Sequence, residues 1–250
     1  METERTLLVI TGHSRGLGAA LTAWGLAKGL HVLGLSRGHL VQTHPHLEQI
    51  SIDLAQPQAL EGVLDGLALR GSLTGFQRIW LINNAGLLGP IHRVGGQAPP
   101  EIAQAVAVNL QALLTLTNWF VGQTQGLPDR RVVHVSSGAA RSPYVGWSIY
   151  CATKAAVDHY ARCLALEAQA EGPSMGLRVC SLAPGVIDTD MQAEVRASSP
   201  TEFPNRPRFE ALKEMGGLAA QHAVAEQLLA YMGSEAFGTE PCADLRSLNR

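Results

Sequence analysis

Charged residues are scarce in this sequence. Asp, Glu, Lys and Arg make up 16% of its 250 residues, whereas apolar residues make up 46%. A chain with so little charge and so many apolar side chains is not disordered, and its length suits one α/β domain. The formal net charge of −2 argues against a protein that binds nucleic acid through a surplus of positive charge.

Long apolar runs are also missing. None approaches the ~20 residues that are needed to span a bilayer. The opening residues, METERTLLVITG, place acids and an Arg before a short apolar run, a pattern typical of neither a signal peptide nor a transit peptide. We therefore expect a cytoplasmic protein that has neither a membrane nor a nucleic acid as a partner.

Metal-binding patterns are absent as well. The sequence has four cysteines and no CxxC pair, which argues against a zinc site and a redox motif and favours buried thiols. The run His44-Pro45-His46 contains two possible ligands, but it lies in a polar loop. We expect no metal.

What the sequence does contain is a regular alternation of strand-like and helix-like segments. The predicted strands are Thr6–Ile10, His31–Leu35, Gln49–Leu54, Arg78–Ile82, Val132–Val135 and Leu177–Leu182. The predicted helices are Arg15–Lys28, Pro57–Leu69, Glu101–Phe120 and Ser148–Ala170. Apolar strands that alternate with helices indicate a parallel sheet covered on both faces. The prediction is a single-domain α/β Rossmann fold over residues 1–250, a doubly wound parallel sheet of about seven strands with helices on both faces.

One segment breaks the alternation. Gln192–Phe209 holds three prolines and several hydroxyl side chains, and its periodicity is weak. A long polar segment inside a compact domain is usually a lid or a disordered loop, and this one follows the carboxyl end of a strand, where such sheets bind ligands. We expect a substrate lid over about residues 186–210, with a surface insertion as the alternative.

A glycine-rich turn follows the first predicted strand. Thr11–Gly18 reads TGHSRGLG and opens the first helix. Its glycines permit a tight turn, and the helix N-terminus presents free N–H groups to a pyrophosphate. The spacing departs from GxGxxG, so the position between strand and helix carries the prediction of a dinucleotide site.

The second predicted strand ends in Leu35-Ser36-Arg37. A protein that binds NAD is expected to have an acid there for the ribose hydroxyls. Arg37, together with Arg15 in the glycine-rich turn, instead suits the 2′-phosphate of NADP. The alternative is that Arg37 is only a solvated charge at the end of a strand.

Tyr150 and Lys154 lie four residues apart on a predicted helix and so share one face. Ser137 follows the preceding predicted strand. Hydride transfer to a carbonyl builds negative charge on the oxygen, which a phenol can protonate. A nearby ammonium group is expected to lower the phenol pKa, and a hydroxyl can hold the substrate oxygen. The alternatives are a half-buried Tyr and a solvated Lys on an amphipathic helix.

These motifs closely resemble the short-chain dehydrogenase/reductase family. The matches are TGHSRGLG, Asn83-Asn84-Ala85-Gly86, Asn109, Ser137 thirteen residues before Tyr150, Lys154, and Pro184-Gly185 with Thr189. The resemblance implies a catalytic set of Asn109, Ser137, Tyr150 and Lys154, in which Asn109 holds a water that connects Lys154 to solvent. It implies a cofactor site of Gly12, Ser14, Arg15, Gly16, Leu17, Gly18, Arg37, Asp53, Leu54, Asn84, Ala85, Gly86, Tyr150, Lys154, Pro184, Gly185, Val186, Ile187 and Thr189.

Within the family, YCATKAA from Tyr150 and APGVIDTDMQ from Ala183 resemble the branch of sepiapterin reductases and benzil-type diketone reductases. Asp244 falls where sepiapterin reductases carry an acid that anchors the pterin amino group; the alternative is a surface charge near the chain end. The expected substrate residues are Ser137, Trp147, Tyr150, Met191 and Asp244, with Leu87 and Leu88 as further pocket walls.

The resemblance therefore implies an NADPH-dependent reductase of a small-molecule ketone or vicinal dicarbonyl. The first alternative is another activity of the family, such as a 3-oxoacyl reductase or an alcohol or sugar dehydrogenase. The second is an NADP-sensing regulator without catalysis, which the intact catalytic set disfavours. The resemblance also implies a homodimer or homotetramer formed through the two long helices, the second of which carries Ala152, Ala155 and Ala156.

Overall fold

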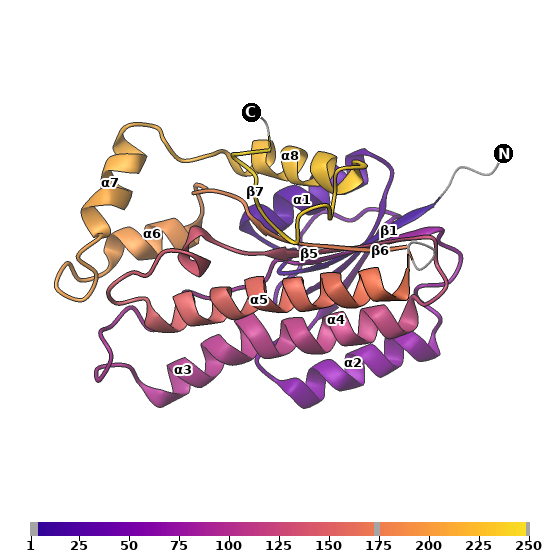
Figure 1. Cartoon of the computed structure of the whole chain (residues 1–250), viewed down its shortest axis with the longest axis horizontal. Coiled ribbons are helices and arrows are strands. Elements are labelled where there is room, and N and C mark those ends of the chain that lie inside the picture. The colour runs from indigo at the N-terminus through magenta and orange to yellow at the C-terminus, as the bar shows by residue number, and fades with distance from the viewer. Residues whose placement is uncertain (1–4, 173–175, 249–250) are drawn as a thin grey trace.

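The computed structural model describes residues 5–172 and 176–248. Within them, seven strands form one sheet in the order β3-β2-β1-β4-β5-β6-β7, and every neighbouring pair is parallel (Figure 1). The strands are β1 (Thr6–Thr11), β2 (His31–Ser36), β3 (Leu47–Ser51), β4 (Arg78–Asn83), β5 (Asp129–Val135), β6 (Leu177–Ala183) and β7 (Cys242–Asp244). The predicted doubly wound α/β fold is confirmed.

Helices cover both faces of this sheet (Figure 1). They are α1 (Gly16–Ala27), α2 (Pro57–Leu69), α3 (Pro99–Val106), the π-helical turn η1 (Ala107–Gln111), α4 (Ala112–Gln123), the short 3₁₀ turn η2 (Gly138–Ala140), α5 (Ser148–Glu171), α6 (Asp190–Ala197), α7 (Arg206–Glu214) and α8 (Gln221–Gly233). Helices α1 and α8 lie on one face, and α2, α4 and α5 lie on the other.

Alternation along the strands explains the two layers. In β1, Leu8 and Ile10 belong to the core beneath α1 and α8, whereas Leu7 and Val9 belong to the core beneath α2, α4 and α5. Successive side chains of a strand point to opposite faces, so a strand buried on both sides must be apolar throughout. The continuous apolar runs in the sequence therefore follow from the central position of these strands.

Several predicted boundaries differ from the structure, two of them near the cavity. The expected strand Gln49–Leu54 is β3 at Leu47–Ser51, so Asp53 and Leu54 lie beyond its end. The expected lid loop contains α6 and α7, and the second of these helices extends past residue 210. The prolines that suggested a loop are compatible with this, because α7 has a Pro in its first turn, where no N–H is needed.

The long helical segment Pro99–Gln123, which joins α3, η1 and α4, is apolar and long enough to cross a membrane by length and composition alone. No apolar run in the sequence is uninterrupted over this length, so the sequence did not mark this segment as a candidate membrane span. Core helices of water-soluble proteins pass the same test. Leu116 and Phe120 of α4 are fully buried in the core against the sheet.

Candidate active site

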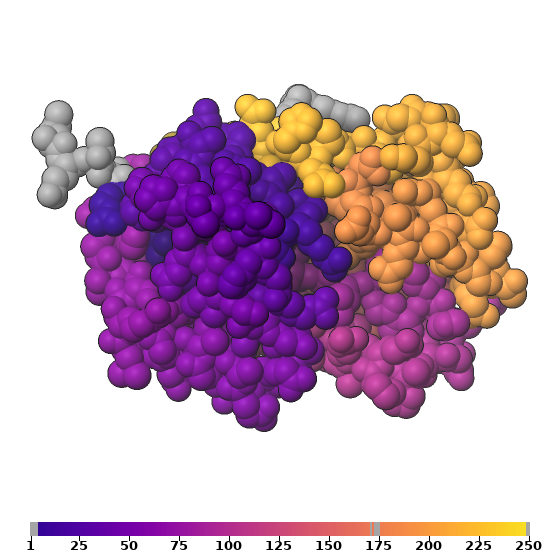
Figure 2. Space-filling model, turned by 180° about the vertical axis from the view of Figure 1, so that it is seen from behind, coloured from indigo at the N-terminus to yellow at the C-terminus, as the bar shows by residue number. Residues whose placement is uncertain are grey.

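A cavity of about 750 Å³ opens at the carboxyl ends of the strands. The space-filling view shows a recess between the N-terminal part of the chain and the segment that follows β6 (Figure 2). Most predicted site residues line this cavity: Gly12, Ser14, Arg15, Gly16, Leu17, Arg37, Asp53, Leu54, Asn84, Ala85, Gly86, Ser137, Trp147, Tyr150, Lys154, Pro184, Gly185, Val186, Ile187, Thr189 and Met191. Leu87 and Leu88 line it too. Gly18, Asn109 and Asp244 are not among the residues that line it.

The glycine-rich turn forms one end of the cavity. Gly12 and Gly16 have φ angles of +68° and +56°, which favour glycine. A Cβ on Gly18 would lie 1.9 Å from the carbonyl oxygen of Gly12, so helix α1 and the turn could not approach as they do. Helix α1 begins at Gly16, and the side chain of its N-cap, Arg15, makes no capping hydrogen bond. The first backbone N–H groups of α1 therefore have no side-chain cap. Together with the cradle formed by the glycines, they fit a pyrophosphate.

Asn84 fastens this turn to the end of β4. Its side-chain amide donates to the carbonyl oxygens of Thr11 and Gly12 at 3.0 and 3.2 Å. The hydroxyl oxygen of Thr11 in turn accepts from the backbone N–H groups of Asn84 and Ala85, each at 3.0 Å. The Asn-Asn-Ala-Gly motif therefore holds the turn rigidly at the edge of the sheet.

The residues expected near the adenosine lie at the ends of β2 and β3. Arg37 is exposed, and Arg15 is exposed at 3.9 Å from the carboxylate of Asp190. The Asp53 carboxylate accepts from the N–H of Ala55 at 3.0 Å. The two exposed guanidinium groups that line the cavity provide positive charge for a phosphate.

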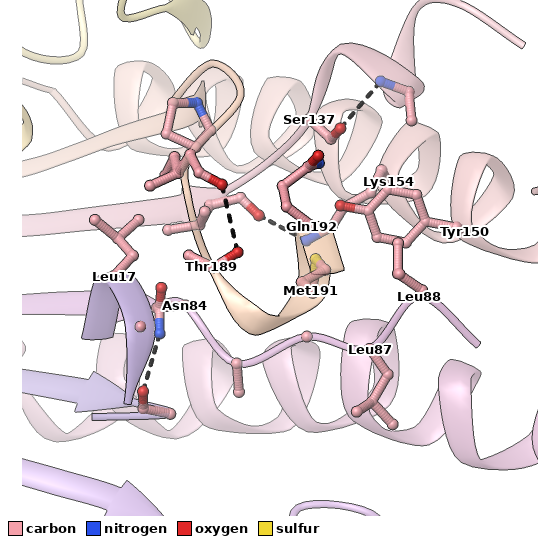
Figure 3. Close-up of a pocket in the computed structure, with 18 of the residues that line it drawn as sticks. Leu17, Asn84, Leu87, Leu88, Ser137, Tyr150, Lys154, Thr189, Met191 and Gln192 are labelled. Atoms are coloured by element: carbon pink, nitrogen blue, oxygen red, sulfur yellow. Dashed lines mark hydrogen bonds between the residues drawn. The ribbon is translucent and has the colours of Figure 1, made fainter. Parts of the chain in front are cut away.

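The three residues expected to act on the substrate meet at the other end. Figure 3 shows Ser137, Tyr150 and Lys154 together, with Met191 and Gln192 beside them. Ser137 caps the short turn η2 and accepts from the N–H of Ala139 at 3.1 Å. The Lys154 ammonium nitrogen donates to the carbonyl oxygen of Val135 at 2.7 Å and lies 5.8 Å from the centre of the Tyr150 ring. The structure thus brings together the residues that the sequence predicted.

Asn109 lies in the π-helical turn η1, near the group formed by Ser137, Tyr150 and Lys154. Its side-chain oxygen accepts from the N–H of Leu87 at 2.7 Å, and its amide donates to the carbonyl oxygen of Leu87 at 2.8 Å and to the Thr153 hydroxyl at 3.2 Å. An extra residue in a helical turn is often found at functional sites. The sequence identified Asn109, but its pattern predicted one continuous helix and missed the π turn.

Burial changes the proton affinities of the reactive pair. It raises the pKa of Tyr150, and the Ser137 hydroxyl opposes that change. It lowers the pKa of Lys154 from 10.5 to about 8, against the attraction of Asp158. The expectation that the ammonium group lowers the phenol pKa is therefore wrong for the free protein, because desolvation is the larger effect. The phenol consequently keeps its proton at neutral pH.

Asp158 is a buried acid that the sequence analysis missed. It lies on α5, one turn after Lys154, and is 2% exposed. Its carboxylate accepts from the hydroxyls of Ser136 and Ser181 at 2.5 and 2.7 Å and from Arg141 at 3.3 Å. The available signal was an acid at the i+4 position after Lys154, on the same face of the helix.

Aromatic side chains form a third core between the cavity and helices α6 and α7. Phe203 is fully buried and stacks on Trp147 with ring centres 4.4 Å apart, and Phe209 and Tyr144 complete the cluster. Met191, Gln192, Arg208 and Phe209 of this region line the cavity. The segment after β6 is thus an ordered cover next to Tyr150.

The structure places Asp244 at the end of β7, with its carboxylate already paired. It accepts from Arg246 Nε at 2.8 Å and from Arg246 Nη2 at 2.6 Å. Arg246 lines the large cavity, whereas Asp244 lines a smaller pocket behind it. A substrate amino group would have to displace Arg246 to reach this carboxylate.

Comparison with known proteins decides the family. The short chain dehydrogenase family model matches residues 6–200. This chain belongs to the short-chain dehydrogenase/reductase family. It is 36% identical over 227 residues to a benzil reductase ((S)-benzoin forming) of Bacillus subtilis strain 168, covering 90% of this chain and 93% of that protein. It is 35% identical over 250 residues to sepiapterin reductase of Meriones unguiculatus, covering 92% of each.

A solved structure supports the same assignment. A short-chain dehydrogenase/reductase from Burkholderia vietnamiensis is 38% identical, with a TM-score of 0.67, covering 97% of this chain and 99% of that one. The protein is therefore an oxidoreductase of a family that uses nicotinamide cofactors and acts on CH–OH or C=O groups. The glycine cradle and the uncapped N-terminus of α1 fit such a cofactor.

Proposed function

We propose that this protein is an NADPH-dependent carbonyl reductase that reduces one carbonyl of an aromatic vicinal dicarbonyl to a hydroxyl group. The observation that carries the proposal is the position of the Tyr150 phenol, which lies near Ser137 and Lys154 in a cavity bordered by the aromatic rings of Trp147 and Phe209. The bound nicotinamide supplies the hydride in this chemistry. The side chains of the protein position the carbonyl and supply the proton.

Tyr150 is the proton donor in this proposal. Burial keeps its phenol protonated, so the O–H can hydrogen-bond to the substrate oxygen and transfer its proton as negative charge develops there. Ser137 donates a second hydrogen bond to the same oxygen, which stabilises that charge. Lys154, held by the Val135 carbonyl, stabilises the phenolate that remains and would help to hold the ribose of a bound nicotinamide cofactor.

Two observations favour an aromatic diketone over a pterin. Apolar and aromatic side chains, among them Leu88, Trp147 and Phe209, line the cavity near Tyr150 beside the polar Gln192, and they can cover a flat aromatic substrate. The acid proposed to anchor a pterin, Asp244, accepts two hydrogen bonds from Arg246. The benzil reductase activity named for the Bacillus subtilis relative agrees with this choice.

The experiment is a comparison of substrates with purified protein. NADPH oxidation is followed with benzil, 1-phenyl-1,2-propanedione, sepiapterin and a 3-oxoacyl thioester. We expect the highest kcat/KM with the two aromatic diketones. Turnover of the thioester alone would favour another activity of the family, and turnover of none would refute the substrate class.

NADPH is the proposed cofactor because Arg37, at the end of β2, and Arg15, in the glycine-rich turn, both line the cavity. Arg37→Asp should weaken NADPH binding at least tenfold and leave NADH binding nearly unchanged, because the new carboxylate repels the 2′-phosphate. Fluorescence titration of both cofactors measures this. Equal losses for NADPH and NADH would contradict a phosphate-binding role for Arg37.

A further inference from the structure

His13 lies fully buried beneath the phosphate-binding turn and joins it to β2 and β3. Its Nε2 is 2.8 Å from Gln49 Oε1, and its Nδ1 is 3.0 Å from the hydroxyl oxygen of Ser36. Gly34 makes room for the ring, since a Cβ there would lie 2.4 Å from Cγ of His13. Each ring nitrogen therefore has a side-chain partner inside the protein, and the backbone of Leu35 also interacts with the ring.

The hydrogen on Nε2 is fixed by the Gln49 amide. The backbone N–H of Leu40 donates to Gln49 Oε1 at 2.7 Å, and the Gln49 amide nitrogen donates to the Leu40 carbonyl at 3.2 Å. These two bonds define which end of the amide is oxygen. Because that oxygen can only accept, Nε2 of His13 must donate to it. The charge of the ring is then decided at Nδ1.

Ser36 has one hydroxyl hydrogen and two possible acceptors. Its oxygen lies 3.0 Å from His13 Nδ1 and 2.7 Å from the carbonyl oxygen of Gly38. When the ring is neutral, Ser36 donates to Nδ1. When the ring is protonated, Nδ1 donates to Ser36, whose hydroxyl is then free to donate to the Gly38 carbonyl or to a stronger acceptor within reach. Ser36 lines the cavity beside Arg37, so an anion there can accept that hydrogen bond.

The charges around His13 determine which state holds. Burial lowers its pKa, His39 lowers it further, and the bond to Gln49 opposes both. Arg15, two residues after His13 in sequence, and Arg37, which follows Ser36, are exposed cationic residues that line the cavity. Glu48, next to Gln49 on β3, is paired with Arg70 at 3.1 Å. An imidazolium at this place is therefore favoured once a phosphate supplies negative charge.

We propose that binding of the cofactor 2′-phosphate is coupled to protonation of His13, which turns the Ser36 hydroxyl toward the phosphate. This rests on the proposed use of NADPH and makes His13 a positioning residue that acts through Ser36. The proton comes from solvent and stays on the imidazole while the cofactor is bound. No covalent bond forms or breaks.

The coupling has a defined sign. Because the complex holds one more proton than the free protein, NADPH affinity falls as pH rises through the pKa of His13 in the complex. The fall approaches about tenfold per pH unit between the two pKa values of His13. NADH, which lacks the 2′-phosphate, should show no such dependence.

Isothermal titration calorimetry tests the proposal. NADPH and NADH are titrated into the full chain at pH 7.5 in two buffers with different ionisation enthalpies, which reports the protons taken up. We expect net uptake of up to about one proton with NADPH and none with NADH. His13→Asn should remove the uptake, and the exposed His222→Asn serves as the matched control that keeps it.

The 2′-phosphate can itself take up or release protons on binding, and it does so equally in every variant. The difference in proton uptake between wild type and His13→Asn therefore reports the histidine alone. Equal proton uptake in those two proteins would overturn the inference while leaving NADPH preference intact. A failure of NADPH to bind more tightly than NADH would instead contradict the proposed function. If His13→Asn does not fold, Ser36→Ala keeps the ring and removes the hydroxyl; unchanged uptake in that variant would also overturn the inference.

Discussion

At the scale of single residues, the buried carboxylate of Asp158 supports the charge on Lys154. It raises the pKa of Lys154 against the larger effect of burial, which lowers that pKa to about 8. The proposed reduction needs both the phenol and the ammonium protonated, so its rate should fall as pH rises through about 8. Groups that raise the pKa of Lys154 therefore extend activity to higher pH.

Asp158→Asn should move the falling limb of the kcat–pH profile to lower pH, because the variant lacks the charge that favours the ammonium. Glu167→Gln, on an exposed site of the same helix, is the matched control and should leave the profile in place. Rate–pH profiles with benzil measure both. An unchanged profile for Asp158→Asn, with lower thermal stability alone, would assign Asp158 a purely structural role.

Sequence reasoning at this scale found the residues that the local pattern identifies. The spacing of Tyr150 and Lys154 and the positions of Ser137 and Asn109 follow from motifs. The roles of Asp158 and His13 depend on burial and on partners from other strands, such as Ser181 and Gln49, which lie 23 and 36 residues away. Contacts over these sequence distances leave no local signal, although the i+4 spacing of Asp158 from Lys154 was visible in the sequence.

At the scale of elements, helices α6 and α7 are held by an aromatic core and by Glu202. The Glu202 carboxylate accepts from the N–H of Arg93 at 2.9 Å and lies 3.6 Å from His92. Gly146, with φ of +84°, permits close contact, since a Cβ there would lie 2.3 Å from the Glu202 carbonyl oxygen. Helices this short are marginal alone, so tertiary contacts stabilise them.

Phe203→Ala should loosen this cover, because a large buried ring is lost from between the cavity and α7. We expect at least a threefold rise in the KM for benzil and little change in NADPH affinity. Phe120→Ala is the control, since Phe120 is equally buried but packs in the core below the sheet. It should cost about 3–5 kcal/mol of global stability. Steady-state kinetics and thermal melts separate the two; an unchanged KM in Phe203→Ala would contradict a role of the cover in substrate binding.

The difference in burial between the strands and helices α6 and α7 explains why the strands could be predicted from the sequence and the cover could not. Strands such as β1 and β4 are buried on both faces, and each is a continuous apolar run visible in the sequence. Helices α6 and α7 are only partly buried and begin near prolines and polar residues. Their structure depends on Trp147 and Phe203, which are 56 residues apart in sequence and stack in the fold.

At the scale of the whole molecule, the outer faces of α4 and α5 are the proposed contact between chains. Leu166 on α5 is 66% exposed in the single chain and would be covered by such a contact. We expect a homodimer or homotetramer by light scattering. Leu166→Glu should reduce the measured mass, whereas Leu69→Glu, at an 88% exposed site on α2, should not. A single-chain mass for the wild type would contradict this assembly.

The central claim is that Tyr150 protonates the carbonyl oxygen as hydride is transferred. The most direct measurement is the turnover of benzil by Tyr150→Phe, together with NADPH titration of the same variant. Removing only the hydroxyl should lower kcat at least a thousandfold and change the Kd for NADPH less than threefold, because the lost group acts on the substrate oxygen. A variant that binds NADPH and still reduces benzil at a rate near that of the wild type would contradict the account.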